Sequence, residues 1–397
     1  MMSRPLRILH LFANYKWTGP ADVAIRAAVW QERAGHEVVF AIAGHCPPDG
    51  EHRMAVELRN AKLAVVTGLE LRKHFHARSI MRDARALAQR LKRDRFDVVV
   101  SHSLGDHLIA SLSLRGLGPR RPTLVRCLYD DDAPRRGWRT WLAFDATDGV
   151  VAPTATVAQD VERRFGFSSA DILVQEPPTE SFRRHLDGDL RSRWGVPKTA
   201  FLVGITARIQ PHRRFDLLWE TLARLADDPY DVRIVLLGRG NERDTRRLVL
   251  DPIASLGLSE RVVLPGYLYE PDYSLALRSL DAFLFLVPGS DGTCRALREA
   301  TALGIPAVGT PRGLIPHLLG PPAGWPSIGP CGLVAEEDAD ALAAALRRLA
   351  AQPELRATLR EAGLARAHGP AEPAAAAARF AAFIAGLRGA AADGGGR

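Results

Sequence analysis

The chain has 397 residues, 47% of them hydrophobic and 25% charged, with a formal net charge of +8. This length exceeds one typical domain, so two α/β domains are the natural expectation. No apolar run approaches the roughly 18 residues of a membrane span, and no nucleic-acid motif accompanies the basic balance. The four cysteines match no zinc, redox or disulfide spacing, which favours a reducing cytoplasm.

Strand-like and helix-like segments alternate through the first half of the sequence. The apolar run 6–13 predicts a first strand, and its interruption by His10 argues against a signal peptide. An amphipathic helix is expected over 21–34. Further strands are expected at 38–43, 96–100, 123–128, 149–152 and 172–174. This alternation predicts a parallel, doubly wound sheet.

The second half repeats the pattern after a polar, charged stretch between about Arg183 and Pro197. Strands are expected at 201–206, 232–237, 262–264, 282–286, 306–308 and 332–334, and late helices at 339–350, 353–367 and 371–387. The glycine-rich end predicts a disordered tail. We therefore expect a first domain over 1–185, a linker over 186–198, a second domain over 199–368, a last helix over 369–388 and a tail over 389–397.

A strongly basic segment lies in the first half, from Leu71 to Arg95. It opens with Leu-Arg-Lys-His-Phe-His-Ala-Arg and continues as an arginine-rich predicted helix. Such a segment could lie on an anionic lipid surface. A solvated basic helix is the alternative, and the sequence leaves both open.

The most informative segment is Gly289–Ala300, which follows an apolar strand and leads into a predicted helix. Asp291 stands at the expected helix start, and Glu299 lies eight residues later. At ~1.5 Å per residue, their carboxylates would lie about 12 Å apart on roughly one helix face. The amides of a helix N-terminus favour phosphate, whereas carboxylates suit sugar or ribose hydroxyls. An N-cap aspartate with a solvated glutamate is the alternative.

Cations gather where the predicted strand 201–206 meets the next helix. Arg208 and Arg213 lie there, at the edge of an open sheet where ligands bind. Arginines in this position can clamp a diphosphate and stabilise the charge that grows on it as it leaves. A solvated basic loop is the alternative.

Two candidates lie in the first half of the chain. His102 follows the strand 96–100, where an imidazole can donate to a hydroxyl or titrate near neutral pH. Gly19 lies in the loop after the first strand. The alternative for His102 is a structural histidine, which is the role that we expect for His107. The alternative for Gly19 is an ordinary strand-to-helix turn.

Together these segments resemble the retaining glycosyltransferases of the GT-B fold, especially glycosyltransferase family 4. Asp291 and Glu299 resemble its acidic-x7-Glu signature, with aspartate in place of the usual glutamate. Arg208 and Arg213 resemble its Arg-Leu-x-x-x-Lys-Gly segment, with Arg214 in place of the glycine. The resemblance covers essentially the whole chain and implies a GT-B α/β fold, with two Rossmann-like doubly wound domains facing a cleft.

The resemblance also implies roles for these residues. Arg208 and Arg213 would bind the donor diphosphate, and Glu299 the ribose hydroxyls. Asp291 and the backbone amides after it would hold the donor sugar, with His102 beside that sugar. The remaining implied donor-binding positions are Gly19, Gly238, Gly266, Tyr267, Gly292 and Thr293.

The expected function is a metal-independent, retaining transfer of a sugar from a nucleotide diphosphate sugar. The acceptor would be a glycan, a lipid or a small molecule, no separate cofactor is needed, and a peripheral contact with the inner face of the membrane is open. The alternatives are another GT-B activity, such as an epimerase or an inverting transferase, and a donor-binding partner protein that has lost turnover.

Overall fold

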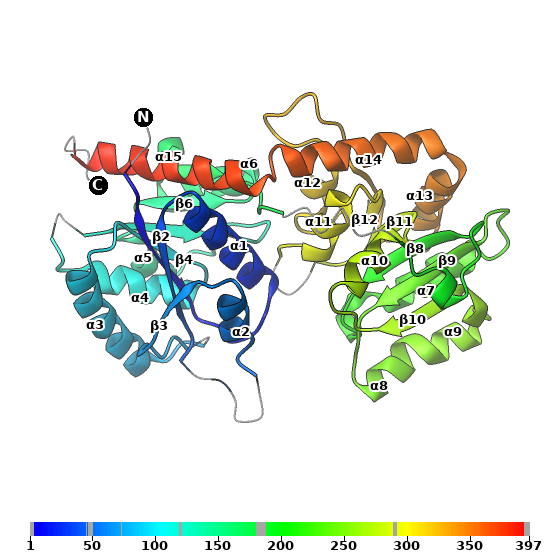
Figure 1. The fold of residues 1–397 in the computed structure, drawn as a ribbon, viewed down its shortest axis with the longest axis horizontal. Helices are drawn as coiled ribbons and strands as arrows, with labels where there is room; N and C mark the ends of the chain where they lie inside the picture. The colour runs from blue at the N-terminus through cyan, green and yellow to red at the C-terminus, as the bar shows by residue number, and fades with distance from the viewer. Residues whose placement is uncertain are drawn as a thin grey trace. The chain divides into compact units, whose positions relative to one another are not determined.

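The computed structural model describes residues 4–44, 46, 51–72, 74–118, 121–179, 188–288 and 292–392. The chain divides into two compact units. Unit 1 combines Met1–Pro178 with Ala371–Arg397, and unit 2 is Thr179–Pro370. Each unit is a parallel β-sheet with helices packed on both faces (Figure 1), which confirms the expected fold class.

Unit 1 contains a seven-stranded parallel sheet in the order β3-β2-β1-β4-β5-β6-β7. Its strands are β1 (Arg7–Phe12), β2 (Glu37–Ile42), β3 (Ala64–Val66), β4 (Val98–Ser101), β5 (Thr123–Cys127), β6 (Gly149–Ala152) and β7 (Ile172–Val174). The strand order reverses between β1 and β4, and ligands of open α/β sheets bind outside the carboxyl ends of the strands at such a switch point.

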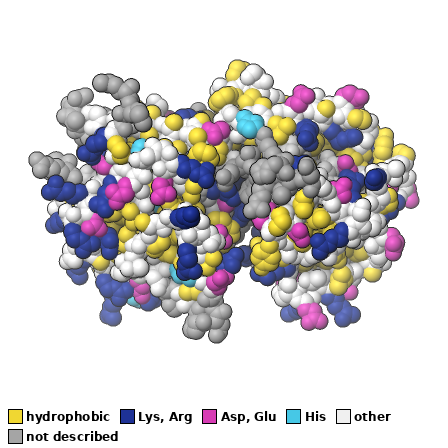
Figure 2. Space-filling model, viewed as in Figure 1, with side chains coloured by type: hydrophobic (Ala, Val, Ile, Leu, Met, Phe, Trp, Pro, Cys, Tyr) yellow, Lys and Arg dark blue, Asp and Glu magenta, His cyan; other side chains and the backbone are white. Residues whose placement is uncertain are grey.

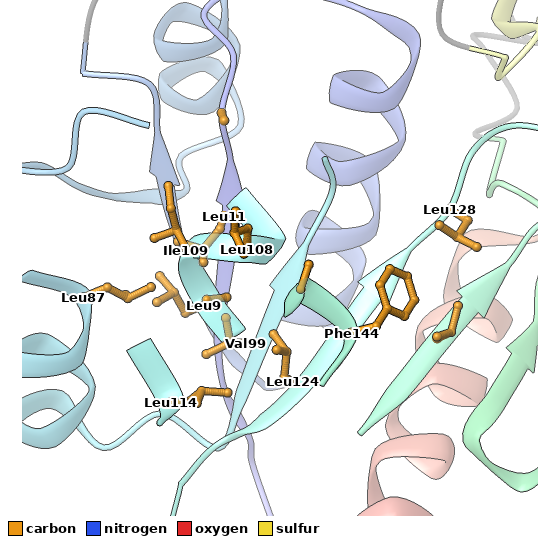
Figure 3. Close-up of a cluster of buried hydrophobic side chains, with 14 of the residues drawn as sticks. Leu9, Leu11, Leu87, Val99, Leu108, Ile109, Leu114, Leu124, Leu128 and Phe144 are labelled. Atoms are coloured by element: carbon orange, nitrogen blue, oxygen red, sulfur yellow. The ribbon is translucent and has the colours of Figure 1, made fainter. Parts of the chain in front are cut away.

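Two hydrophobic cores flank this sheet. The helices of unit 1 are α1 (Gly19–Arg33), α2 (Arg53–Asn60), α3 (Ala77–Asp94), α4 (Leu104–Leu114), α5 (Trp138–Phe144), α6 (Ala155–Phe165) and α15 (Pro373–Ala392). On one face, Leu9 and Leu11 of β1 pack with Leu87, Leu108 and Phe144 of the helices (Figure 3). The intervening residues of β1 point to the other face, as strand alternation requires.

The last helix belongs to unit 1 although it follows unit 2 in sequence. Phe380 and Ile384 of α15 are buried with residues of α1 and the sheet. Gly149 opens β6 beneath it: a β-carbon there would lie 2.6 Å from Leu387 Cδ1 and 2.8 Å from Phe383 Cζ. The glycine therefore makes room for α15.

Unit 2 contains a six-stranded parallel sheet in the order β10-β9-β8-β11-β12-β13. Its strands are β8 (Phe201–Thr206), β9 (Val232–Leu237), β10 (Val262–Gly266), β11 (Ala282–Phe285), β12 (Ala307–Gly309) and β13 (Gly332–Val334). Its helices are α7 (Phe215–Arg224), α8 (Glu242–Thr245), α9 (Asp251–Ser255), α10 (Asp272–Arg278), α11 (Arg295–Ala302), α12 (Ile315–Leu319), α13 (Ala339–Ala351) and α14 (Pro353–His368). The order again reverses beside the first strand, between β8 and β11.

Two boundaries and one strand differ from the sequence expectation. Unit 1 ends at Pro178, earlier than the expected 185, and residues 180–187 lie outside the described part of the chain. The short edge strand β3 was not expected. The alanine-rich α15 continues to Ala392, past the expected end at 388, because alanine favours the helix. Within the described residues, no helix is both long and apolar enough to cross a membrane.

Candidate functional site

The predicted residues of unit 2 lie after neighbouring parallel strands, at the carboxyl edge of the sheet. Because β10, β9, β8 and β11 are adjacent and parallel, the segments that follow them meet at this edge. The structure places there Arg208 and Arg213 after β8, Gly238 after β9, Gly266 and Tyr267 at the end of β10, and Gly292 and Thr293 after β11.

The two predicted phosphate-binding arginines have different surroundings. Arg208 is exposed, and its side chain makes no ion pair or hydrogen bond with any residue that the structure describes. Arg213 is partly buried, and its Nη1 donates to the carbonyl oxygen of Pro288 at 3.2 Å. That contact anchors Arg213 to the segment leaving β11, so it is the more rigidly placed of the two.

Arg214 occupies the position where the resembling family has glycine. Its backbone is left-handed, with φ of 57°, a conformation that glycine adopts without a steric cost. Its guanidinium pairs with Asp216 at 3.1 Å and with Glu337 at 3.2 Å. This left-handed turn therefore explains the glycine of the family segment. Arg214 adopts the same turn and adds two ion pairs.

Glu299 is buried on α11, and both of its carboxylate oxygens already accept hydrogen bonds. Arg295 Nε donates to Oε1 at 2.7 Å, and the Tyr273 hydroxyl donates to Oε2 at 3.0 Å. Burial, together with the Glu299 charge, raises the pKa of Tyr273 well above its usual value, so this hydroxyl stays protonated as a donor. Each carboxylate oxygen has a second lone pair, which leaves capacity for a ligand hydroxyl.

The start of α11 corrects the sequence expectation. The helix begins at Arg295, with Cys294 as its N-cap residue, and not near Asp291, which lies outside the described residues. Gly292 and Cys294 have positive φ angles of 71° and 47°, so this stretch cannot be helical. Helix α11 therefore does not extend back through residues 292–294.

Aromatic and glycine residues complete this edge. A β-carbon at Gly238 would lie 1.9 Å from the Ala207 carbonyl oxygen, so close backbone approach requires the glycine. Gly266 has a φ of 82°. Tyr267 is 51% exposed, and the Arg239 guanidinium lies 5.0 Å from its ring centroid. This leaves an exposed aromatic face and a cation beside the ends of β9 and β10.

In unit 1, His102 is buried within a chain of hydrogen bonds that the sequence did not reveal. Its Nε2 lies 2.9 Å from His10 Nδ1, and its Nδ1 lies 2.5 Å from the Tyr129 hydroxyl. His10 Nε2 in turn lies 2.9 Å from Gln31 Oε1. Both ring nitrogens of His102 are therefore occupied within unit 1.

Gln31, at one end of this series of hydrogen bonds, sets the tautomers of both histidines. Gln31 Oε1 can only accept, so His10 carries its proton on Nε2 and accepts through Nδ1. His102 then donates from Nε2 and accepts from the Tyr129 hydroxyl at Nδ1. Burial lowers the pKa of His10 to about 4 and lowers the pKa of His102 well below its usual value. Both imidazoles are neutral near pH 7, so His102 is oriented and is not a ready base.

Asp106 joins the loops that carry Gly19 and His102. Its carboxylate accepts from the backbone amides of Ala13 at 3.1 Å and His102 at 3.2 Å, which ties the loop after β1 to the loop after β4. Gly19 is the first residue of α1, which Thr18 caps. Gly19 and His102 thus lie at the same edge of the sheet, beside the switch point between β1 and β4.

A cavity of about 50 Å³ adjoins the hydrogen-bonded chain within unit 1. That volume is large enough to admit water. Its polar lining comes from His10, Gln31, His102, Tyr129, Gln175 and Glu176. Among the described residues, no group of three His, Cys, Asp or Glu side chains is placed to hold a metal ion.

Two family models match the chain, one in each half. Residues 17–178 match Glycosyltransferase Family 4, and residues 188–366 match Glycosyl transferases group 1. The two matches together show that the chain is similar to family 4 glycosyltransferases of the GT-B fold over most of its length. A relative named as a colanic acid biosynthesis glycosyltransferase, WcaL of Escherichia coli (strain K12), is 33% identical over 169 residues, which cover 40% of this chain and 38% of WcaL.

A second relative is the D-inositol 3-phosphate glycosyltransferase of Geodermatophilus obscurus. It is 29% identical over 181 residues, which cover 43% of this chain and 37% of the relative. The chain thus spans less than two fifths of the length of either curated relative.

Solved structures share the fold over nearly the whole chain. A glycosyltransferase from Rickettsia africae ESF-5 has a TM-score of 0.78 at 16% identity, with 97% of this chain and 99% of that chain covered. Anabaena Alr3699/HepE, solved in complex with UDP, has a TM-score of 0.73 at 17% identity, with 96% and 100% covered.

Proposed function

We propose that this glycosyltransferase moves a sugar from a nucleotide diphosphate sugar to an acceptor hydroxyl, with retention at the anomeric carbon and without a metal ion. The observation that carries the proposal is that Arg208 and Arg213 follow β8 and Glu299 lies on the helix that follows β11, and β8 and β11 are adjacent parallel strands of one sheet. All three lie within the residues that match the group 1 family model. The acceptor is a glycan, a lipid or a small molecule.

Each residue has a distinct role in this proposal. Arg208 and Arg213 bind the donor diphosphate and stabilise the charge that develops on it as the glycosidic bond breaks. Glu299, held by Tyr273 and Arg295, accepts the ribose hydroxyls. Asp291, with the backbone amides of Gly292 and Thr293, holds the donor sugar.

For His102 and Gly19 of unit 1, the family resemblance is the ground for proposing a role toward the donor sugar. Hydrogen bonds to Tyr129 and His10 occupy both nitrogens of the His102 imidazole, so in this proposal the ring contributes its shape beside the sugar and removes no proton. No side chain is assigned as a general base. The departing phosphate takes the proton of the acceptor hydroxyl while the new bond forms on the same face of the sugar, which accounts for retention.

The nucleobase is proposed to lie beside Gly238, Gly266 and Tyr267, at the ends of β9 and β10. HepE, which shares the fold, is solved with UDP and with UDP-glucose. UDP-sugars are therefore the first donors to test, ahead of sugars carried by other nucleotides.

A thermal-shift screen against nucleoside diphosphates and their sugars, in the presence of a chelator, tests the donor site. A ligand at 100 times its Kd stabilises the folded protein by about 2.7 kcal/mol. We expect a shift with one nucleotide class that Arg208→Ala removes. Arg348→Ala is the matched control, because this exposed arginine near the end of α13 makes no ion pair with the described residues.

Turnover by the same variants tests the role of the arginine in catalysis. Loss of one such charge contact raises the barrier by about 2–4 kcal/mol, or roughly 30- to 1000-fold in rate. Full turnover by Arg208→Ala would refute the phosphate assignment. Donor binding without transfer to any acceptor would favour the partner-protein alternative, and the anomeric configuration of the product would separate retention from inversion or epimerisation.

A further inference from the structure

Three large aromatic side chains of unit 1 are exposed beside an arginine. Trp138 and Trp141 are 64% and 67% exposed, and Phe75 is 44% exposed. The rings of Phe75 and Trp138 meet edge to face, with centroids 5.9 Å apart. The Arg139 guanidinium lies 4.0 Å from the Phe75 centroid and 5.2 Å from that of Trp138. We call these four residues the tryptophan patch.

The fold gathers this patch at one end of three neighbouring helices. Phe75 lies two residues before the start of α3, and Trp138 is the first residue of α5. Helix α4 packs against both of these helices and opens with Leu104, which is 38% exposed. Trp138 and Trp141 are three residues apart on α5 and so share one helix face. The apolar surface is therefore shared by several elements.

Helix α3 continues this surface with a basic face. Its buried face consists of Ile80, Ala84, Leu87 and Leu91, while Arg78, Met81, Arg82, Arg85 and Lys92 are exposed. Arg82 pairs with Glu70. The side chains of Arg78, Arg85 and Lys92 make no ion pair with any residue that the structure describes. Lys and Arg side chains gather over α3 at the lower left of Figure 2.

Acidic groups near this surface are few and partly neutralised. Asp83 is buried and accepts from the backbone amides of residues 70 and 71. Asp94 pairs with Arg90 and Arg93. Among the acidic residues 130–132, Asp132 pairs with Arg164 at 2.7 Å. The exposed side chains of α3 itself thus carry positive charge.

We propose that the tryptophan patch and the basic face of α3 together bind the surface of a membrane that contains anionic phospholipid. Tryptophan and phenylalanine partition into the interface between headgroups and acyl chains. Arginine and lysine beside them are attracted to the negative lipid surface. A purely electrostatic partner would not require exposed tryptophans, and a purely apolar partner would not require unpaired arginines. The proposal does not depend on the donor or on the chemistry of transfer.

Vesicle flotation of the full chain tests this proposal. With vesicles of one part phosphatidylglycerol to three parts phosphatidylcholine, we expect binding at 50 mM salt that weakens strongly at 500 mM, and a blue shift of tryptophan fluorescence. Phosphatidylcholine vesicles should bind at least tenfold more weakly. The double variant Trp138→Ser/Trp141→Ser should lose the blue shift and most of the binding.

Charge variants separate the two parts of the surface. Arg78→Glu/Arg85→Glu should weaken binding to the anionic vesicles by at least tenfold. The matched controls lie in unit 2: Trp325→Ser, at a tryptophan that is 40% exposed, and Arg243→Glu/Arg348→Glu, at two exposed arginines. Both controls should bind like the unmodified protein. Unchanged thermal unfolding of all variants would show that the fold is intact.

Three results would overturn the proposal. One is absence of binding to anionic vesicles at low salt, and another is binding that the tryptophan and arginine variants leave unchanged. The third concerns Trp138→Ser/Trp141→Ser. If this variant lost turnover on a water-soluble glycan acceptor but still bound vesicles normally, the tryptophan patch would be assigned to acceptor binding. Loss of donor binding in Arg208→Ala has no bearing on these outcomes, so the two proposals fail separately.

Discussion

At the scale of single residues, the arrangement around His102 limits the chemistry open to this imidazole. A neutral histidine has one donor and one acceptor, and here Tyr129 and His10 use both. The network is directional from the tyrosine hydroxyl to the Gln31 oxygen. Its members come from β1, α1 and the segments after β4 and β5, so one substitution disturbs groups that are distant in sequence.

The Tyr129→Phe variant tests this network. Removing the hydroxyl leaves Nδ1 of a buried histidine without its donor, which costs about 1–3 kcal/mol. We expect the free energy of unfolding, measured in urea, to fall by that amount. Tyr269→Phe is the control, because Tyr269 is 62% exposed and its loss of a hydroxyl should change stability by less than about 0.5 kcal/mol. Equal effects of the two substitutions would contradict the network.

The sequence predicted His102 as a candidate but not its partners, for a physical reason. His10, Gln31 and Tyr129 meet His102 through the parallel register of β1 with β4, in which His10 pairs with Val100, and through the packing of α1. Neither can be obtained from local residue patterns. Tyr273, which donates to Glu299 from α10, was missed for the same reason, whereas Arg295 lies four residues before Glu299 and could have been found from helix spacing.

At the scale of elements, the strands of both sheets could be predicted because short runs of β-branched and apolar residues recur between turns. The start of α11 could not. Gly292 is compatible with many conformations, and nothing in the sequence indicates that Cys294 adopts a left-handed backbone. The helix N-terminus consequently lies four residues later than the acidic signature suggested, and the location of Asp291 remains a prediction.

Helix α15 gives a prediction of its own at this scale. Ile384 is fully buried, and truncation of such a side chain costs about 2–5 kcal/mol. Ile384→Ala should therefore loosen α15 from unit 1, lower the unfolding free energy and speed proteolysis of the C-terminal segment. Ala382→Ser, at an exposed position of the same helix, should leave the proteolysis rate unchanged. Faster cleavage in both variants would show that α15 frays regardless of this contact.

At the scale of the whole molecule, unit 1 buries several ionisable groups, and burial is the largest cause of their pKa shifts. Burial lowers the pKa of His10 to about 4 and lowers the pKa of His102 and of His107 well below the usual range. Burial acts the opposite way on a carboxyl group and raises the pKa of Asp106 to about 6. The acid stability of the protein depends on which of these effects is larger.

The proton balance predicts that acid destabilises the protein. Between about pH 6.5 and 4, each of these three histidines binds a proton in the unfolded chain but stays largely neutral in the folded chain. The stability that each neutral histidine contributes is therefore lost as the pH falls. Asp106 has the opposite effect, because between about pH 6 and 4 its folded form binds a proton that the unfolded form releases. One histidine offsets Asp106, so these four groups give a net uptake of about two protons on unfolding near pH 5, and His36, whose pKa burial also lowers, acts in the same direction. The unfolding free energy should then fall by roughly 2–3 kcal/mol per pH unit around that pH.

Urea unfolding at pH 7, 6 and 5 would measure this slope. His107→Gln should reduce it by about a third to a half, since it removes one of the buried imidazoles, which accepts from or donates to Ser101 and Thr147. Replacement of the exposed His74 by glutamine should leave the slope unchanged. A stability that is flat or rises between pH 7 and 5 would mean that the histidines are protonated in the folded protein, and the neutral chain from Tyr129 to Gln31 would then be wrong as well.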